Sequence, residues 1–226
     1  MGNATASLQA ASAATKSVPI LGTAVTNYQV ALNLKKFNGT VGGNISGTSD
    51  LAPLNKQEKM IKDFVPKAKK LGTLDCSAEP NSKYQTDEVA KYAKKDGLKV
   101  TKYTFSDTND VNSVTQQAAS ASDVIYIPTD NTAASCAKTI NGSKAKVPII
   151  AGEEWIMSKC EVATLSIDYY GLGKQTGKMA VQILTGKKKI AQMPVQYYKN
   201  PVKEYNPTIC KKLGIKVPAG YKAYKN

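Results

Sequence analysis

The sequence predicts a doubly wound α/β protein, in which helices cover both faces of a mostly parallel sheet. Three observations point to this fold class. Apolar runs of strand length alternate with helical patterns between residues 70 and 152. Two of those runs, 123–129 and 147–152, are apolar almost throughout, which is typical of parallel strands covered on both faces. Polar residues then gather directly after the runs.

The middle of the chain gives the clearest alternation. Strands are expected at 70–76, 98–105, 123–129 and 147–152, with helices at 81–97, 110–122 and 131–140. Asn81 or Ser82 would cap the first of these helices, and Gly97 would end it. The resulting β-α-β-α-β-α-β order indicates a doubly wound parallel sheet.

The first 50 residues follow the same alternation of strands and helices, but begin with a helix. A helix is expected at 5–15, a strand at 18–25 and a weaker helix at 27–37. The glycine-rich segment 39–51 is expected to turn a corner, and a helix at 53–68, with Pro53 at its start, would lead into a second unit. Because a helix opens the chain with no strand before it, the first unit is expected to lack at least one strand.

The last third of the chain crosses between the units again. Its expected elements are strands at 162–168 and 193–198 and helices at 170–187 and 207–213. The run Gly171–Lys178 looks like a phosphate-binding loop, but its glycine spacing matches neither a P-loop nor a dinucleotide fingerprint. A nucleotide-dependent enzyme is therefore disfavoured, and the glycines are expected to serve a strand-to-helix turn and close helix packing.

Composition excludes several classes of function. The net charge is +14, yet all 31 basic residues are lysine, and the chain has neither arginine nor histidine. Because sequence-reading proteins rely on the guanidinium fork, nucleic acid is not expected as a partner, and attraction to an anionic cell surface fits better. Without histidine there is no Ser-His or Cys-His catalysis, and the cysteines lack metal spacing. No enzyme activity, metal or cofactor is expected, and free thiols are favoured over disulfides.

Polar clusters follow the expected strands at their carboxyl ends. They occupy 23–27, 76–82, 128–132, 152–155 and 166–170. Ligands of open parallel sheets bind at this edge, and helix N-termini there suit a carboxylate or another anion. Each cluster alone is also explained as helix caps and loop residues, which every α/β protein needs. Their recurrence along one expected edge in both units favours a ligand cleft.

Four segments carry a resemblance to a known family: GTSDLAPLNKQEKMIKDFVPKAKKLGTL, SDVIYIPTDNTAAS, VPIIAGEE and ATLSIDYYGLGKQTGKMAVQILTGK. They closely resemble ABC-transporter substrate-binding proteins of the tryptophan/tyrosine-binding type, and the resemblance extends over essentially the whole chain. It implies a type I periplasmic-binding-protein fold, in which two α/β lobes joined by a three-segment hinge close on an amino acid. It also implies an ABC permease as partner, no catalysis, and an extracytoplasmic, lipid-anchored location at the cell surface.

By this resemblance the first lobe would comprise 1–50 plus 166–190, and the second 51–165 plus 191–226. The family's secretion signal, anchor cysteine and first strands have no counterpart here. The resemblance therefore implies an N-terminally truncated member with an incomplete first lobe. An adhesin-like cell-surface module, in which the ligand cleft is secondary, is the alternative function.

An amino-acid ligand needs a counter-charge for its ammonium group and hydrogen-bond donors for its carboxylate. Asp168, at a strand end, is the first candidate for the ammonium, although it could equally cap the helix that follows. Asn131 and Thr129 come next, with loop capping as their alternative. Carboxylate donors could come from Ser82 in the second lobe and from Thr5, Ser7 and Thr26 in the first.

A pair of acidic residues and two aromatic residues complete the candidates. Glu154 follows a strand end together with Glu153, and one of the two is expected to face the ligand. Trp155 and Tyr169 could stack on an aromatic ligand or belong to the core.

Overall fold

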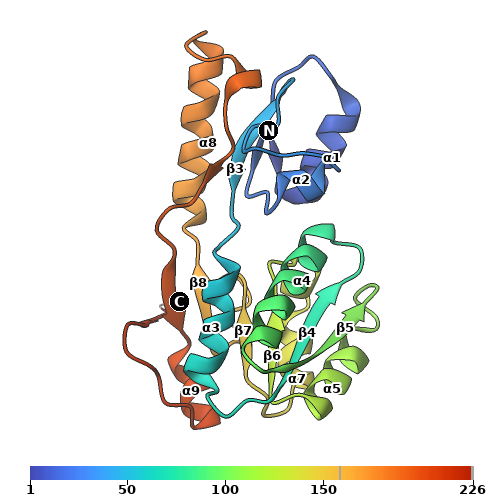
Figure 1. Cartoon of the computed structure of the whole chain (residues 1–226), viewed down its shortest axis with the longest axis vertical. Coiled ribbons are helices and arrows are strands. Elements are labelled where there is room, and N and C mark those ends of the chain that lie inside the picture. Colours follow the sequence, from blue (N-terminus) through green and yellow to red (C-terminus); the bar gives the residue numbers. More distant parts are fainter. Residues whose placement is uncertain (158, 225–226) are drawn as a thin grey trace. The chain divides into compact units, whose positions relative to one another are not determined.

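The chain crosses three times between two α/β units in this computed structural model, which describes residues 1–157 and 159–224 (Figure 1). Unit 1 contains Met1–Leu51 and Ile167–Pro201, and unit 2 contains Ala52–Ser166 and the chain from Val202 onward.

The third crossing falls after residue 201, so the boundary expected at residue 190 is wrong. The reason is the strand β9 (Gln196–Tyr197), which pairs in parallel with β3 (Ile45–Ser49). This pairing keeps residues 191–201 in unit 1.

Unit 2 is built on a seven-stranded sheet in the order β11-β10-β8-β7-β6-β4-β5. The strands are β4 (Lys70–Cys76), β5 (Lys99–Phe105), β6 (Val124–Ile127), β7 (Ile149–Ala151), β8 (Ala163–Ser166), β10 (Val202–Tyr205) and β11 (Lys222–Ala223). The strands from β5 to β8 are parallel, and β10 runs antiparallel to β8. The strands expected between residues 70 and 152 are confirmed, whereas β10 and β11 had no counterpart in the sequence prediction.

Helices cover both faces of this sheet, and Figure 1 shows α3 and α4 lying over the strands on one of them. The helices are α3 (Leu54–Phe64), α4 (Pro80–Lys95), α5 (Val111–Ala121), α6 (Asn131–Ser135), α7 (Ala137–Ser143) and α9 (Pro207–Leu213).

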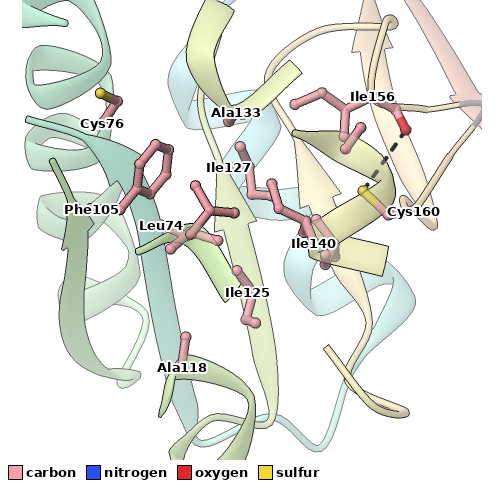
Figure 2. Packing of buried hydrophobic residues seen from close by; sticks show 13 residues of the cluster. Leu74, Cys76, Phe105, Ala118, Ile125, Ile127, Ala133, Ile140, Ile156 and Cys160 are labelled. Carbon is pink, nitrogen blue, oxygen red and sulfur yellow. Dashed lines mark hydrogen bonds between the residues drawn. The ribbon is translucent and has the colours of Figure 1, made fainter. Parts of the chain in front are cut away.

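Alternate side chains of β6 show how the two faces are divided. Ile125 and Ile127 point into the core formed with α5 and α7, where they lie near Ile140 (Figure 2). Tyr126, between them, points to the opposite face, and its hydroxyl donates to the buried Gln57 of α3 at 2.6 Å. Successive side chains of a strand alternate between faces. A strand buried on both faces therefore has to be apolar or internally hydrogen-bonded throughout, and this explains the uninterrupted apolar run in the sequence.

Two helix boundaries in unit 2 differ from the prediction. α4 begins at Pro80 with Glu79 as its N-cap, because proline lacks the N–H that the first helical turn leaves unbonded. The caps expected at residues 81 or 82 are therefore wrong. The helix expected at 131–140 is interrupted at Cys136, whose φ of −99° and ψ of 12° separate α6 from α7.

Unit 1 is built on a four-stranded parallel sheet in the order β1-β2-β3-β9. Its further elements are β1 (Gly2–Asn3), β2 (Ile20–Thr23), α1 (Ala4–Ala14), α2 (Tyr28–Ala31), α8 (Tyr169–Leu184) and the 3-10 turn η1 (Ile190–Gln192). A two-residue strand thus precedes the first helix, contrary to the prediction. The helix expected at 27–37 is reduced to the single turn of α2.

The strand β3 corrects the expectation that 39–51 only turns a corner. All five of its residues are buried, and it lies between β2 and β9. Gly47, with a φ of +149°, pairs with Gly22 of β2. A Cβ atom on Gly47 would lie 2.0 Å from the carbonyl oxygen of Gly22 and 2.3 Å from the hydroxyl oxygen of Tyr28. The glycine serves close packing, so a turn-like composition conceals a buried strand.

The later glycines of α8 do not pack closely, which contradicts the prediction for this helix. A Cβ atom added to Gly173 or Gly177 meets nothing within 4 Å. On Gly171 it would lie 2.4 Å from Oδ2 of Asp168, the N-cap of the helix. The buried residues of α8 are instead Leu172, Thr176 and Met179.

Candidate ligand-binding site

In unit 2, three neighbouring parallel strands bring three polar loops to one edge. β4, β6 and β7 are adjacent in the sheet, so the segments that follow them share the edge of their carboxyl ends. These segments contain the predicted polar clusters 76–82, 128–132 and 152–155. Each loop is held by hydrogen bonds that involve the candidate residues.

A half-buried carboxylate ties the first two loops together. Oε2 of Glu79 accepts from the backbone N–H and the side-chain amide of Asn131, each at 3.0 Å. Oε1 accepts from the backbone N–H of Thr132 at 2.7 Å and from its hydroxyl at 2.8 Å. Burial alone would raise the pKa of Glu79, but these hydrogen bonds outweigh it and the pKa is lowered. Asn131 therefore lies at the exposed start of α6 with its amide directed to Glu79.

The backbone of Thr129 is held from several sides. Its carbonyl accepts from the side chains of Asn81 at 2.9 Å and Ser82 at 3.1 Å. Gln85 donates to the same carbonyl at 3.3 Å and accepts from the Thr129 N–H at 3.2 Å. The Thr129 hydroxyl donates to the carbonyl of Gly152 at 3.4 Å. Ser82 is fully buried, so its hydroxyl supports this edge from within unit 2.

Asp130 joins the same loops from inside the protein. Its buried carboxylate accepts from the backbone N–H of Ala133 at 2.8 Å, which caps α6, and from that of Cys76 at 2.7 Å. Burial raises its pKa to about 6, and the nearby charge of Glu79 acts in the same direction. The loops after β4 and β6 thus form one hydrogen-bonded body.

The loop after β7 presents the aromatic candidate of unit 2. Glu153 is buried and accepts from the backbone N–H groups of Trp155 at 2.7 Å and Ile156 at 3.1 Å, whereas Glu154 is half-buried. The Trp155 side chain is 69% exposed, so the alternative that it belongs to the core is wrong. Together with Asn131 it lines a surface cavity of about 590 Å³.

In unit 1, Asp168 takes the helix-capping role that the sequence allowed. Its Oδ1 accepts from the backbone N–H of Gly171 at 2.9 Å at the start of α8, and its side chain is exposed. An exposed carboxylate at this position can cap the helix and meet a ligand at the same time.

The other candidates of unit 1 are less accessible, apart from Ser7. Thr26 is buried, and its carbonyl accepts from the hydroxyl of Ser49 at 2.9 Å. Thr5 is buried in the first turn of α1. Ser7 is exposed but lies one turn further along α1, beyond the unpaired N–H groups of the helix start.

Asp50 is a further candidate residue that the sequence reasoning missed. It follows β3 directly, is 3% exposed, and accepts from the hydroxyl of Tyr169 at 3.2 Å. Its other oxygen, Oδ1, has no hydrogen-bond partner among the described residues, and burial raises the pKa of the carboxyl group. The signal was an aspartate at a strand end, and it was lost because 39–51 was expected to be a turn.

Three threonine hydroxyls meet near the carboxyl ends of β2 and β3, two residues before Asp50 along β3. Thr176 of α8 lies 2.8 Å from Thr48 and 3.0 Å from Thr23, measured between hydroxyl oxygens. Thr176 occupies the place of the third glycine in a dinucleotide fingerprint. A buried hydroxyl there joins α8 to the sheet and leaves no phosphate cradle.

Comparison with known proteins agrees with this architecture. A family model described as ABC transporter substrate binding protein matches residues 1–223. The tyrosine-binding protein of Clostridioides difficile (strain R20291) is 39% identical over 193 residues, which are 84% of this chain and 55% of that protein. The chain thus spans about half the length of this curated relative.

Two solved structures are similar over nearly the whole chain. The ABC domain from Streptococcus pneumonia in complex with L-Trp is 35% identical with a TM-score of 0.92, over 99% of this chain and 77% of that one. A ligand-free, open substrate-binding protein with adhesive properties from Clostridium difficile is 38% identical with a TM-score of 0.75, over the same shares.

Two α/β units linked by three chain crossings, with polar strand ends in each, are the architecture of the type I periplasmic-binding-protein fold. The chain belongs to the ABC transporter substrate-binding protein family. Members of this family are extracytoplasmic solute-binding proteins rather than enzymes. Within residues 1–157 and 159–224, no helix has the length and apolar character needed to cross a bilayer.

Proposed function

We propose that this protein is the solute-binding component of an ABC importer and binds an aromatic amino acid, with the two units closing on the ligand. The observation that carries the proposal is the pair of relatives at 39% and 35% identity, one called tyrosine-binding and the other solved with L-Trp. The three chain crossings support hinge closure, because such crossings are where relative motion of two lobes is absorbed. A membrane permease as partner, and lipid anchoring at the cell surface, belong to the same proposal.

The candidate residues divide into contact and support roles in this proposal. Asp168, Asn131 and Glu154 reach the surface and are proposed to contact the ligand, with Asp168 opposite its ammonium group. Trp155 and the exposed Ser7 are also proposed to contact the ligand. The half-buried Thr129 and the buried residues Ser82, Thr26 and Thr5 are proposed to hold the binding edges and to offer backbone groups.

Titration calorimetry tests the ligand class. Tryptophan, tyrosine and phenylalanine are titrated into the purified protein, with leucine as the control for apolar side chains. At least one aromatic amino acid is expected to bind ten or more times tighter than leucine. Absence of heat with all three aromatic amino acids contradicts the proposal.

The chain's one tryptophan provides an independent readout. Because Trp155 is 69% exposed, covering it with tyrosine or phenylalanine is expected to shift its emission to shorter wavelength. The Trp155→Phe variant supplies the blank, since any remaining change then comes from the ligand. Binding seen by calorimetry without an emission change removes Trp155 from the site.

Adhesion at the cell surface is the second candidate function. It is supported by the relative described as having adhesive properties and by the net charge of +14. Binding to cultured epithelial cells is expected to fall with rising salt and to persist when an aromatic ligand is saturating. Adhesion no greater than that of a neutral control protein at low salt contradicts this function.

A further inference from the structure

Unit 2 contains a second cavity, of about 430 Å³, whose lining shares Lys159 with the cavity beside Trp155. It lies between the end of α7 and the start of α9. α7 leads into β7 through Val147, and Asn206 before α9 donates its N–H to the carbonyl of Val162 before β8. The cavity therefore lies at the amino ends of β7 and β8, whereas the candidate site lies at the carboxyl ends of the strands.

The polar lining of this cavity is strongly basic. Lys144, Lys146, Lys159 and Lys212 all contribute to it, and none of the described residues that line it is acidic. Burial raises the pKa of the Tyr224 hydroxyl, which is also part of the lining, and the charges of Glu154, Glu204 and Glu153 act in the same direction. Those three carboxylates do not line the cavity themselves.

Lys144 is the buried member of this group. It is 3% exposed, and its ammonium group donates to the carbonyl of Val147 at 3.3 Å. Lys144 takes part in no ion pair among the residues that the structure describes. Burial lowers the pKa of Lys144, the nearby Cys160 thiol opposes this shift, and the charge of Lys212 acts in the same direction as burial.

A buried ammonium group carries three N–H donors, and a single carbonyl leaves two of them without an acceptor among the described residues. Burying a charge is unfavourable unless it is paired. An anion in the cavity would supply both the missing acceptors and the missing charge. Four ammonium groups around one space suit an anion with more than one negative charge and several oxygens, and lysine is a regular phosphate ligand.

We propose that the cavity lined by Lys144, Lys146, Lys159 and Lys212 binds a phosphate-bearing group. Its volume exceeds that of phosphate alone, so it has room for the organic part of a phosphate ester. The group comes either from a free phosphate ester or from the headgroup of an anionic phospholipid. Because Lys159 also lines the cavity beside Trp155, the test variants leave it unchanged.

Titration with glycerol phosphate at constant ionic strength tests the proposal. The double variant Lys146→Gln/Lys212→Gln removes two exposed lysines of the cavity, and Lys144→Met removes the buried one. The control, Lys187→Gln/Lys188→Gln, removes two exposed lysines of unit 1. Affinity is expected to fall at least tenfold in both cavity variants and to stay within twofold in the control. If Lys144→Met does not fold, the exposed pair alone decides the outcome.

A vesicle assay distinguishes the two sources. Vesicles of phosphatidylglycerol and phosphatidylcholine are sedimented with each variant, with pure phosphatidylcholine as the blank. Loss of vesicle binding in the cavity variant but not in the control assigns the site to a phospholipid headgroup. Tight glycerol phosphate binding, with equal vesicle binding in both variants, assigns it to a free ester. Absence of glycerol phosphate binding together with equal vesicle binding in all variants overturns the proposal.

Discussion

Carboxyl groups in this protein act differently according to what surrounds each of them. Glu79 accepts five hydrogen bonds and its pKa is lowered, whereas Asp130 is buried and its pKa rises to about 6. Asp168 is exposed and caps α8. A ligand's ammonium group needs an ionised carboxylate within reach of solvent, and among these three the exposed cap satisfies that condition best.

Asp168→Asn separates the capping role from ligand binding. Asparagine is as good an N-cap as aspartate, so the free energy of unfolding should change by less than about 0.5 kcal/mol. Affinity for the aromatic ligand should fall about tenfold or more, because a hydrogen bond to a charged group contributes roughly 1.5–3 kcal/mol. Asp110→Asn, at the N-cap position of α5, changes a carboxylate of unit 2 that accepts from the N–H groups of Ser106 and Asp107, and as the control it should leave affinity unchanged. Unaltered affinity in Asp168→Asn would leave Asp168 as a helix cap only.

Glu58 of α3 predicts a pH dependence of stability. It is 1% exposed, and its Oε1 has no hydrogen-bond partner among the described residues. Burial raises its pKa from 4.5 to about 7, and the charge of Asp96 at the end of α4 adds to this. Because the folded-state pKa is the higher one, the stabilisation is complete below about pH 4.5 and is lost as the pH rises through about 7.

Glu58→Gln should remove this dependence, since an amide does not titrate. The wild-type free energy of unfolding should fall by roughly 1–3 kcal/mol more than that of Glu58→Gln between pH 5 and 8. Urea denaturation at several pH values measures the difference. Glu88→Gln, in a surface pair with Lys91, is the control and should follow the wild type. Parallel wild-type and Glu58→Gln profiles would contradict the assignment.

At the scale of single elements, glycine permits close packing in β3 but not in the later turns of α8. In β3 the missing Cβ lets two strands and the hydroxyl of Tyr28 approach one another. In the later turns of α8 nothing approaches, so the glycines there only lower helix stability. Composition alone could not distinguish these cases, because the partner that fills the space lies elsewhere in the chain.

Gly47→Ala and Gly173→Ala form a matched pair that tests this distinction. Gly47→Ala should destabilise unit 1 by more than about 3 kcal/mol, since it combines a disallowed φ with backbone overlap. Gly173→Ala should stabilise it by about 0.5–1 kcal/mol. Thermal unfolding followed by circular dichroism compares the two variants. Similar midpoints for both would show that β3 does not pack as described.

At the scale of the whole molecule, each unit is assembled from two distant stretches of the chain. Unit 1 combines the first 51 residues with 167–201. Unit 2 combines residues 52–166 with the chain from residue 202 onward. The β3–β9 pairing and the β8–β10 pairing are the contacts that join these stretches. In each unit, therefore, the later stretch of the chain supplies the strands at one edge of the sheet: β9 in unit 1, and β10 and β11 in unit 2.

Ligand binding should stabilise both units if both hold the ligand. At a free aromatic amino acid concentration 100 times Kd, the free energy of unfolding should rise by about 2.7 kcal/mol. Hydrogen exchange followed by mass spectrometry should show slower exchange in both the loops of 128–132 and the start of α8. Slower exchange in one unit only would restrict the site to that unit.

The sequence by itself determined the α/β class, the order of elements between residues 70 and 152, and the family. The class and the order of elements follow from the burial period, which is a local property of the chain, and the family follows from the resemblance of whole segments to known sequences. The tertiary structure alone decided that 45–49 is a central strand, that the last crossing falls after residue 201, and that Ser82 and Thr129 bond to neighbouring loops. The physical reason is that a hydrogen-bond partner or a close backbone contact is set by which strands lie side by side, and a local pattern does not contain that information.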